Sequence, residues 1–573
     1  MLGPNQEAAL RFKSSSRVIG AVLALSLIAG ACGSDDNNTS TAPKKSVDAS
    51  TVDINATPRA DLKQGGTLKF PLSGFPANFN PNELDGSDRD STDVTSAMLP
   101  APFIFNGKAE PIIDKNYVSS AEITSTDPQV VTYVLNPKAV WYDGTKVSEA
   151  DYEALWNAMK TAEGTDFQIV ASNGYDQISS VKAGKDDHEV VVTFSKPYAD
   201  WQALFSGLIP ASTSKDPKIF NEGWVDKPLT TAGPFKLEKA DSTAKTISIV
   251  PNEKWWGNKP LLDKIVFISI DVDAQIDSLA NGEIDFIDIG PDIDKYQRAK
   301  SLSGVSIHRA GGPNFRHITI NGTGEILKDV NVRHALALAI DRKTIAKAML
   351  GPLGGNADAL NNHIFMANQK GYKNNAGDIA SVNPEKAKTM LDAAGWKLNG
   401  SDTVRTKAGK QLVIRMVIPA QVATSEKEAT LIAGMFTAVG AKLQIDTVSL
   451  DDFFDKYITP GDFDMTVFSW LGTPFPISSS KSIYAKPAGD DIQQNYSRVG
   501  SDEIDALFDD ATSELDPDKA IDIANKIDKL IWTEVHSLTS YQRPELYATK
   551  DTLANYGAFG FATTIYEDIG FTK

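Results

Sequence analysis

Segments with the pattern of β-strands alternate with segments with the pattern of α-helices through most of this chain. The clearest run predicts a strand over 411–418, a helix over 430–439 and a strand over 441–448. A strand, a helix and a strand at this spacing form a βαβ unit, whose two strands lie parallel. Repeated alternation of this kind predicts α/β lobes, in which helices cover the faces of sheets.

Capping residues mark two further helices. Ser148 and Asp151 have the spacing of a capping box, which predicts that a helix follows Ser148. Another helix is bounded by Asn383 and Pro384 at its start and by Gly395 at its end. Runs rich in β-branched and aromatic residues predict strands at 65–70, 130–135, 188–194, 246–250, 264–270 and 317–321.

The N-terminal residues have the organisation of a secretory signal. Basic residues precede an apolar run at 18–31, and small residues precede Cys32. This run is shorter than the about 20 residues that span a membrane. A cysteine directly after Ala-Gly-Ala resembles a bacterial lipobox, in which the cysteine is lipidated after cleavage. We therefore predict a signal peptide over 1–31 and lipidation of Cys32, with ordinary secretion and an incidental cysteine as the alternative.

A polar stretch follows the cysteine. Residues 33–64 are rich in Ser, Thr, Asn and Asp and contain few large apolar side chains, so they cannot bury enough surface to fold alone. We predict that 32–64 is a lipidated N-terminus followed by a flexible tether with a reach of about 30 Å. The folded part is predicted to begin at residue 65.

Composition excludes several classes of protein. The formal net charge of −17 argues against nucleic-acid binding, which needs basic surfaces, and one cysteine in 573 residues excludes a disulfide or a cysteine-based metal site. The six histidines form no H-E-x-x-H motif, and neither a G-x-S-x-G elbow nor a P-loop occurs. We predict no enzymatic activity, no metal site and no cofactor. Acidic pairs are plentiful, and their pattern alone leaves a glycoside hydrolase open.

Six segments resemble motifs of one protein family, in the same order along the chain. The first resembles W-x-D-G-x-P-V-T-A-x-D, with Lys146 in place of the usual proline, and others resemble T-G-P-Y, S-G-E-I-D and D-V-R-V-R. Together they resemble the family 5 extracellular solute-binding proteins, which include oligopeptide-, dipeptide- and nickel-binding proteins. The matching segments are 140–152, 231–235, 252–260, 281–285, 329–342 and 383–396.

The resemblance implies a periplasmic-binding-protein-like α/β fold, with two large lobes that close over a cleft and a smaller third lobe. Gly311-Gly312-Pro313 and the region of Leu530 are the hinge candidates, because hinges concentrate backbone change at a few positions. The implied boundaries are 65–107, 218–315 and 530–573 for lobe I, 108–217 for the smaller lobe II, and 316–529 for lobe III.

The resemblance also implies where a ligand lies. In peptide-binding members an aspartate anchors the peptide amino terminus, and alignment on Trp470 puts Thr473 at that position. Val467 falls where an arginine can meet a peptide carboxylate. A hydroxyl cannot neutralise a buried ammonium, so these departures weigh against a peptide with a free amino terminus. The implied ligand contacts are Trp470, Leu471, Gly472, Thr473, Phe475, Asn495 and Tyr496 on one wall, and Asp85, Asp88, Arg89 and Asp90 on the other.

Two features of these walls have open alternatives. The loop 83–93 carries five carboxylates and one arginine, and is either a solvated acidic loop or a wall that binds a cation. Trp470 and Phe475 either stack on a sugar ring or an apolar side chain of the ligand, or pack under the rim of the cleft.

By this resemblance the chain is expected to be the receptor of an ABC importer for oligopeptides or a related small solute. It would be a monomer, anchored by lipid to the extracytoplasmic face of the cell membrane, in the periplasmic space or outside the cell. Its partners would be the ABC permease and the ATPase subunits. The alternative is a non-transport envelope lipoprotein of the same fold that binds or regulates glycolipid machinery, and a hydrolase is the third hypothesis.

Overall fold

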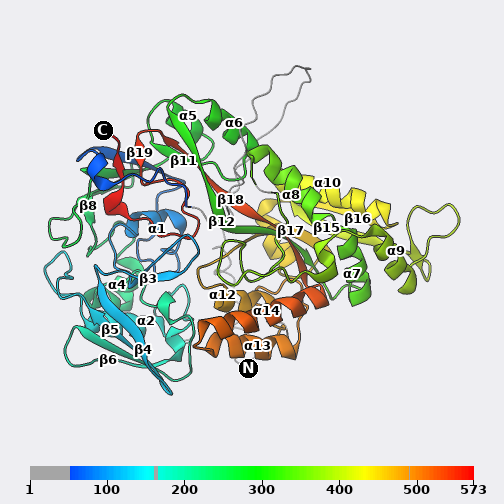
Figure 1. The fold of residues 1–573 in the computed structure, drawn as a ribbon, viewed down its shortest axis with the longest axis horizontal. Helices are drawn as coiled ribbons and strands as arrows, with labels where there is room; N and C mark the ends of the chain where they lie inside the picture. The colour runs from blue at the N-terminus through cyan, green and yellow to red at the C-terminus, as the bar shows by residue number, and fades with distance from the viewer. Residues whose placement is uncertain (1–51, 161–165, 356, 490) are drawn as a thin grey trace, which may run out of the picture.

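Two long strands join the two halves of the molecule. The computed structural model describes residues 52–160, 166–355, 357–489 and 491–573 (Figure 1). The predicted signal peptide over 1–31, Cys32 and the first part of the predicted tether lie outside these residues. Strands β12 (Val305–Ile320) and β18 (Ser537–Lys550) run side by side across the molecule. We call the elements before β12 and after β18 the first lobe, and the elements between them the second lobe.

The central sheet has six strands in the order β11-β18-β12-β17-β15-β16. Strand β12 pairs antiparallel with both β18 and β17. Strands β15 and β16 pair in parallel and are connected by helix α10, which confirms the predicted βαβ unit. The remaining elements of this sheet are β11 (Phe286–Asp288), β15 (Val413–Pro419), β16 (Lys442–Val448), β17 (Met465–Leu471) and α10 (Ala423–Ala438).

Helix α10 begins at Ala423, earlier than the predicted start at Thr430. The added turns are polar and lack the apolar period that located the predicted helix. They are held by an ion pair instead, because Glu428 is buried and accepts from the Arg316 Nε of β12 at 3.2 Å. This pairing between distant residues explains why the apolar pattern placed the start too late.

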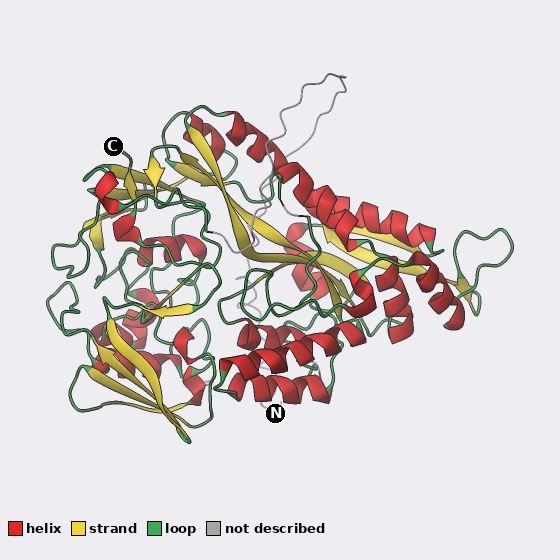
Figure 2. Cartoon of the chain, in the orientation of Figure 1, coloured by secondary structure: helices red, strands yellow, loops and turns green. Residues whose placement is uncertain are grey.

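Helices cover the central sheet of the second lobe on two sides (Figure 2). One apolar cluster joins α7–α10 to β15, and a second lies among α12, α13 and α14. The predicted cap of α9 is confirmed, because the Asn383 side chain accepts from the Lys386 amide. The helix bounds are α7 Val330–Ala339, α8 Arg342–Leu350, α9 Pro384–Ala393, α11 Leu450–Asp452, α12 Pro476–Tyr484, α13 Asp502–Ser513 and α14 Pro517–Glu534.

The first lobe contains a four-stranded sheet in the order β1-β10-β9-β8. Strand β1 pairs in parallel with β10, and the predicted strands at 65–70, 246–250 and 264–270 correspond to β1, β9 and β10. The elements are β1 Thr67–Leu72, β8 Phe235–Asp241, β9 Thr246–Pro251, β10 Lys264–Ser269, α1 Arg89–Thr95, α5 Gln275–Ala280 and α6 Ile293–Ser301.

A second four-stranded sheet, in the order β4-β5-β7-β6, shares one apolar cluster with the first. The predicted capping box is confirmed, since Asp151 accepts from the Ser148 amide at 3.0 Å. The bounds are β4 Val118–Thr126, β5 Gln129–Leu135, β6 Ile178–Ala183, β7 Glu189–Phe194 and α2 Glu149–Met159. The short elements are β2 Phe103–Phe105, β3 Pro111–Ile113, α3 Ala211–Ser214, α4 Pro217–Glu222, β13 Thr406–Lys407, β14 Lys410–Gln411, β19 Leu553–Ala554 and β20 Gly570–Phe571.

The end of the predicted tether is wrong, because the chain joins the folded body well before residue 65. Asp53 pairs with Ala558 through two backbone hydrogen bonds, and its carboxylate lies 3.0 Å from Nδ1 of His308. Arg59 forms an ion pair with Asp568 near the C-terminus. Polar contacts with distant residues, rather than local apolar burial, hold this segment, so its composition did not reveal them.

Across the described ranges, every helix is too short or too polar to cross a lipid bilayer.

Candidate binding site at the crossing strands

Strands β12 and β18 change register where they pass between the lobes. Gly311 lies opposite Pro544 and Phe315 lies opposite Gln542, so residues 312–314 bulge opposite Arg543. A side chain at Gly312 would place its Cβ atom 2.7 Å from the Arg543 carbonyl oxygen, which leaves room for glycine alone. The hinge segment predicted at 311–313 therefore lies at the crossing.

The second predicted hinge, near Leu530, is wrong. Leu530 lies inside α14 and packs against an apolar cluster. A residue inside a helix cannot change φ and ψ freely, because its backbone is fixed by hydrogen bonds to the neighbouring turns. The C-terminal crossing lies instead at Gln542, Arg543 and Pro544 of β18.

Gln542 ties a loop of the second lobe to this crossing. Its Nε2 donates to the Gly312 carbonyl at 2.7 Å and to Oδ1 of Asn368 at 2.8 Å. Its Oε1 accepts from the Ala367 amide at 3.1 Å, and Asn368 Nδ2 donates to the Gly311 carbonyl at 3.2 Å. The loop around Ala367 is therefore bonded to both crossing strands.

A cavity of about 220 Å³ lies at the crossing. Both long strands and the loop regions around Leu360 and Ala367 contribute to its walls. None of the residues predicted to contact a ligand lines it. The lining residues are Arg309, Ala310, Gly311, Gly355, Asp358, Ala359, Leu360, Ala367, Tyr372, Gln542, Arg543 and Pro544.

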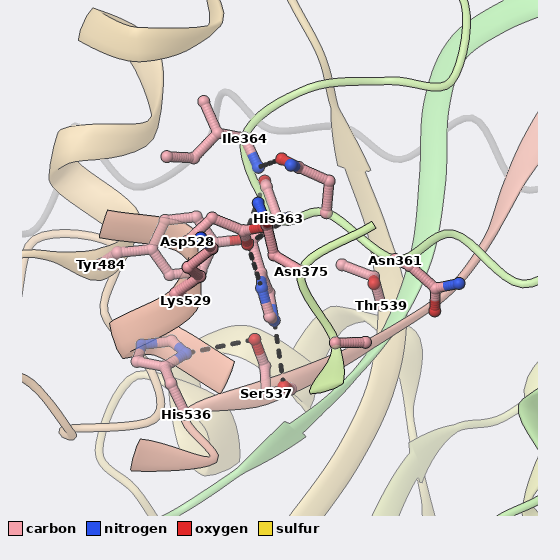
Figure 3. A network of polar contacts seen from close by, with 12 residues as sticks. Asn361, His363, Ile364, Asn375, Tyr484, Asp528, Lys529, His536, Ser537 and Thr539 are labelled. Carbon is pink, nitrogen blue, oxygen red and sulfur yellow. Dashed lines mark hydrogen bonds and ion pairs between the residues drawn. The ribbon is translucent and has the colours of Figure 1, made fainter. Parts of the chain in front are cut away.

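A buried polar network holds the loop that forms one wall of the cavity (Figure 3). His363 Nδ1 lies 2.8 Å from Oδ1 of Asp528 in α14, and His363 Nε2 lies 3.0 Å from the Ser537 carbonyl of β18. Asn375 donates to the second Asp528 oxygen at 2.8 Å. Because each buried polar group has a partner, the network fixes the loop in one position.

Two arginines are among the residues that line the cavity. Nη1 of Arg543 donates to the Ser469 hydroxyl at 3.2 Å, one residue before Trp470. Arg309 donates through Nη2 to the Leu353 carbonyl, but its Nη1 is buried without a hydrogen-bond partner. Burial lowers the pKa of both arginines, and the positive charge of Arg316 lowers that of Arg543 further.

The acidic side chains near Arg543 are already bonded elsewhere. Glu428 is paired with Arg316 and accepts from the Tyr541 hydroxyl at 2.8 Å. Glu545 accepts from the Gly560 amide at 2.5 Å, and burial raises the pKa of its carboxyl to about 7. Asp358 is the one acidic residue among the lining residues.

Trp470 packs among other rings of the protein. Its indole lies parallel to the Tyr496 ring at 5.9 Å and nearly parallel to the His317 ring at 5.6 Å. This geometry favours the alternative in which Trp470 packs under the rim. Leu471 is different, because 71% of its surface is exposed, the highest value among the exposed large apolar residues of the described chain.

The residues after β17 are bonded into the junction between the lobes. Gly472 donates its amide to the Pro313 carbonyl at 2.8 Å, and the Thr473 carbonyl accepts from Gln369 at 2.8 Å. The Thr473 hydroxyl lies 3.0 Å from that of Ser479. Phe475 packs edge-on against Phe105 of the first lobe, with ring centroids 5.5 Å apart. This segment therefore contacts both lobes.

Asn495 does not face a ligand site, so its predicted role is wrong. Its side chain is fully buried, and Nδ2 donates to the carbonyls of Ala485 at 2.8 Å and Val499 at 2.7 Å. Its Oδ1 accepts from the Arg498 amide at 2.8 Å. The side chain thus holds the loop under Tyr496, which is itself 9% exposed.

The acidic loop of the first lobe has its side chains largely engaged in local structure. Asp88 caps α1 by accepting from the Ser91 amide, and Asp90 accepts from the Ser73 and Gly74 amides at 3.0 and 2.8 Å. Arg89 forms an ion pair with Asp288 at 3.0 Å. The Asp85 amide donates to the Glu83 carboxylate at 2.8 Å. These contacts order the loop, and they do not bring it to the cavity.

Among the residues that the structure describes, one cluster has the spacing of metal ligands. Ligand atoms of Asp186, Asp187 and His188 lie within 4.8 Å of one another. The aspartates are exposed, and His188 Nδ1 already lies 2.8 Å from Asp187. We assign this cluster no role, because exposed acidic groups commonly occur without a metal.

Sequence reasoning missed the two arginines and Gln542. Gly311-Gly312-Pro313 reads as a turn, and Pro544 interrupts the strand pattern of 537–550. The residues on both sides of Pro544 show no regular alternation of polar and apolar side chains, so this pattern does not predict β18. No motif marks Arg309 or Arg543.

Comparisons with known proteins place the chain in one group. The family model for bacterial extracellular solute-binding proteins, family 5 Middle, matches residues 115–491. The oligopeptide-binding protein OppA of Mycobacterium tuberculosis is 41% identical over 538 residues, covering 93% of this chain and 89% of that protein. The probable monoacyl phosphatidylinositol tetramannoside-binding protein LpqW of the same species is 27% identical, over 57% of this chain and 52% of its own.

A solved structure agrees with the sequence matches. The periplasmic EDTA-binding protein EppA superposes with a TM-score of 0.81 at 26% identity, covering 92% of this chain and 99% of that one. The fold is therefore shared over most of the chain.

Proposed function

Because this chain belongs to the bacterial extracellular solute-binding proteins of family 5, we propose that it captures a small solute between its two lobes. The observation that carries the proposal is the cavity at the crossing of β12 and β18, which is lined by residues from both strands. Rotation of the lobes about this crossing would change the walls of the cavity. A ligand favours closure only if it makes better contacts in the closed form than in the open form.

The proposed ligand is an oligopeptide or a related small solute. Support comes from the relative named as oligopeptide-binding, which is 41% identical along both lobes. We propose that the end of β17 forms part of the binding wall, with exposed Leu471 and half-buried Thr473 and Phe475 facing the ligand. Peptides bound beside a strand end gain main-chain hydrogen bonds, and pockets for alternate side chains add selectivity.

The remaining parts of the proposal concern where and with what the protein works. We propose that Cys32 carries a lipid anchor, which keeps the body at the extracytoplasmic face of the cell membrane. The chain would act as a monomer and deliver its ligand to an ABC permease with its ATPase subunits. It would have no enzymatic activity, since its family is one of substrate-binding proteins.

Calorimetric titration of the mature protein with peptides of two to nine residues tests this function. A peptide at about 100 times its dissociation constant adds about 2.7 kcal/mol to the free energy of unfolding, because it binds only the folded state. We expect at least one peptide series to bind and to raise the unfolding temperature. Binding of mannosylated phosphatidylinositol with no response to any peptide would replace this function with the envelope role suggested by the relative LpqW.

A further inference from the structure

We propose that the turn at Ala199 and Asp200 is a reversible latch, which joins the two lobes when they close and whose strength is set by Asp200. The turn belongs to the first lobe, and it contacts the ends of α12 and α13 in the second lobe. Figure 1 shows these helices on the side of the second lobe that faces the sheet β4-β5-β7-β6. The proposal goes beyond the proposed function, because it concerns closure through the protein's own contacts rather than through a solute.

The first contact of the latch joins two backbones across the lobes. The Ala199 amide donates to the Thr512 carbonyl oxygen at 2.8 Å. Thr512 lies in the last turn of α13, where carbonyl groups have no partner within the helix. A polar group at this helix end thus finds its partner in the other lobe, and the bond exists only while the lobes are in contact.

The second contact places a carboxylate at the start of a helix. Asp200 lies against Ser478 in the first turn of α12, where the helix dipole attracts negative charge. Burial raises the pKa of the Asp200 carboxyl, and the Ser478 hydroxyl and amide oppose this rise. Its Oδ2 atom is buried without a hydrogen-bond partner among the described residues. Closure therefore takes a charged oxygen out of water with incomplete compensation, which weakens the latch and keeps it reversible.

The turn is held in shape by buried groups of the first lobe. Gln129 donates to the Tyr198 carbonyl at 3.1 Å and accepts from the Tyr198 amide at 2.6 Å. Tyr198 and Trp201, on either side of the turn, are both buried. Because these neighbours are fixed, Ala199 and Asp200 are positioned by the first lobe alone. The latch is therefore preformed on one side of the junction.

Two further contacts extend the junction toward the crossing. Phe105 of the first lobe packs edge-on against Phe475, the residue before α12, with ring centroids 5.5 Å apart. Asn368 of the second lobe donates through Nδ2 to the Gly107 carbonyl at 3.4 Å. Separate segments of both lobes thus meet across the junction, so together they define one relative position of the lobes.

Distances between spin labels test the latch in the mature protein. Cys32→Ser removes the single native thiol, and labels are attached through Lys196→Cys and Asp510→Cys, two exposed positions beside the contact. The variants are Asp200→Asn and Asp200→Lys. The control is Asp226→Lys, which makes the same change of charge at an exposed position of the first lobe. Unfolding without ligand checks that each variant folds.

We expect ligand-free wild type to show a short label distance from closed molecules and a longer distance from open ones. Asn accepts hydrogen bonds at a helix start as Asp does but carries no charge, so Asp200→Asn should raise the share of closed molecules. Lys places a positive charge against the helix dipole, so Asp200→Lys should lower the ratio of closed to open molecules at least about threefold. Asp226→Lys should leave both shares unchanged.

Three results would overturn the latch. Equal shares in wild type, Asp200→Asn and Asp200→Lys would show that this contact does not hold the lobes. A long distance alone in ligand-free wild type would show that the contact does not form unaided. An equal change in Asp226→Lys would show a general effect of charge. Because these distances need no ligand, failure of every peptide to bind would end the proposed peptide function and leave the latch standing. Failure of the latch would likewise leave peptide capture standing.

Discussion

Thr473→Asp should give this protein an anchor for a peptide amino terminus. Thr473 follows β17 at the junction of the lobes, and its hydroxyl accepts from the Phe475 amide at 3.2 Å and contacts the Ser479 hydroxyl. An aspartate carboxylate can accept from the same two donors, since Asp forms the same kind of local turn as Thr. The substitution should therefore keep the local fold while adding a negative charge to the wall.

The size of the effect follows from the half-buried position of Thr473. An ammonium and a carboxylate 4 Å apart attract by about 4 kcal/mol at an effective dielectric constant of about 20. Desolvation of both charges offsets part of this attraction. A net gain of about 1.4–2.8 kcal/mol remains, which is about 10- to 100-fold in affinity.

Calorimetric titration with a free-amine peptide and its N-acetylated form measures this gain. Thr473→Asn is the matched control, because it has the shape of aspartate without the charge. We expect tighter binding of the free-amine peptide by Thr473→Asp alone, and no change for the acetylated peptide. Equal affinities of Thr473→Asp and Thr473→Asn for the free-amine peptide would refute the placement of Thr473 at the ligand amino terminus.

Three further predictions concern the structure around the crossing. Arg316→Met leaves the buried Glu428 carboxylate without its ion-pair partner and should lower the free energy of unfolding, measured in urea, by about 3–5 kcal/mol. The double variant Arg316→Met, Glu428→Leu should recover most of this lost stability. Equal stability of the single and double variants would contradict the prediction. Glu545→Gln removes a carboxyl whose pKa of about 7 lies above its unfolded value. Between about pH 4.5 and 7 the folded state holds that proton and the unfolded state does not. The free energy of unfolding of wild type should therefore fall by about 1–2 kcal/mol more than that of the variant as the pH rises from 5 to 8. Parallel stability profiles of the two proteins would exclude the effect. Gly312→Ala places a Cβ atom against the Arg543 carbonyl oxygen, so it should lower the free energy of unfolding by about 1–3 kcal/mol and weaken ligand binding. An unchanged temperature of thermal unfolding would show that the crossing can relax.

Local pattern predicted most of the regular elements. The βαβ unit, the capped helices α2 and α9 and the strands β1, β5, β7, β9 and β10 follow from periods and caps that lie within about twenty residues, whereas β4, β6 and β8 were not predicted. Of the long strands, only the end of β12 was predicted, as the strand at 317–321, and β18 was not predicted. Gly312 and Pro544 interrupt the strand pattern at the point where the two strands cross. The residues that form the crossing therefore make these strands hard to predict from the sequence.

The site was harder to predict, because its residues are defined by distant partners. Trp470 stacks on Tyr496 and His317, and no sequence spacing links these three residues. Asn495 donates its side-chain hydrogen bonds to neighbouring backbone carbonyls. Arg316 pairs with Glu428 and Arg543 donates to the Ser469 hydroxyl, and the sequence shows neither partner. Burial and hydrogen-bond partners, rather than residue type, show what each of these side chains does.

Mass spectrometry of the mature protein, purified without denaturation from its native envelope, tests solute capture most directly. Small molecules released by unfolding are then identified. The account predicts a bound mass that resolves into short peptides or related small solutes. A protein that carries no such molecule, binds none when peptides are added, and retains a mannosylated lipid would contradict the account.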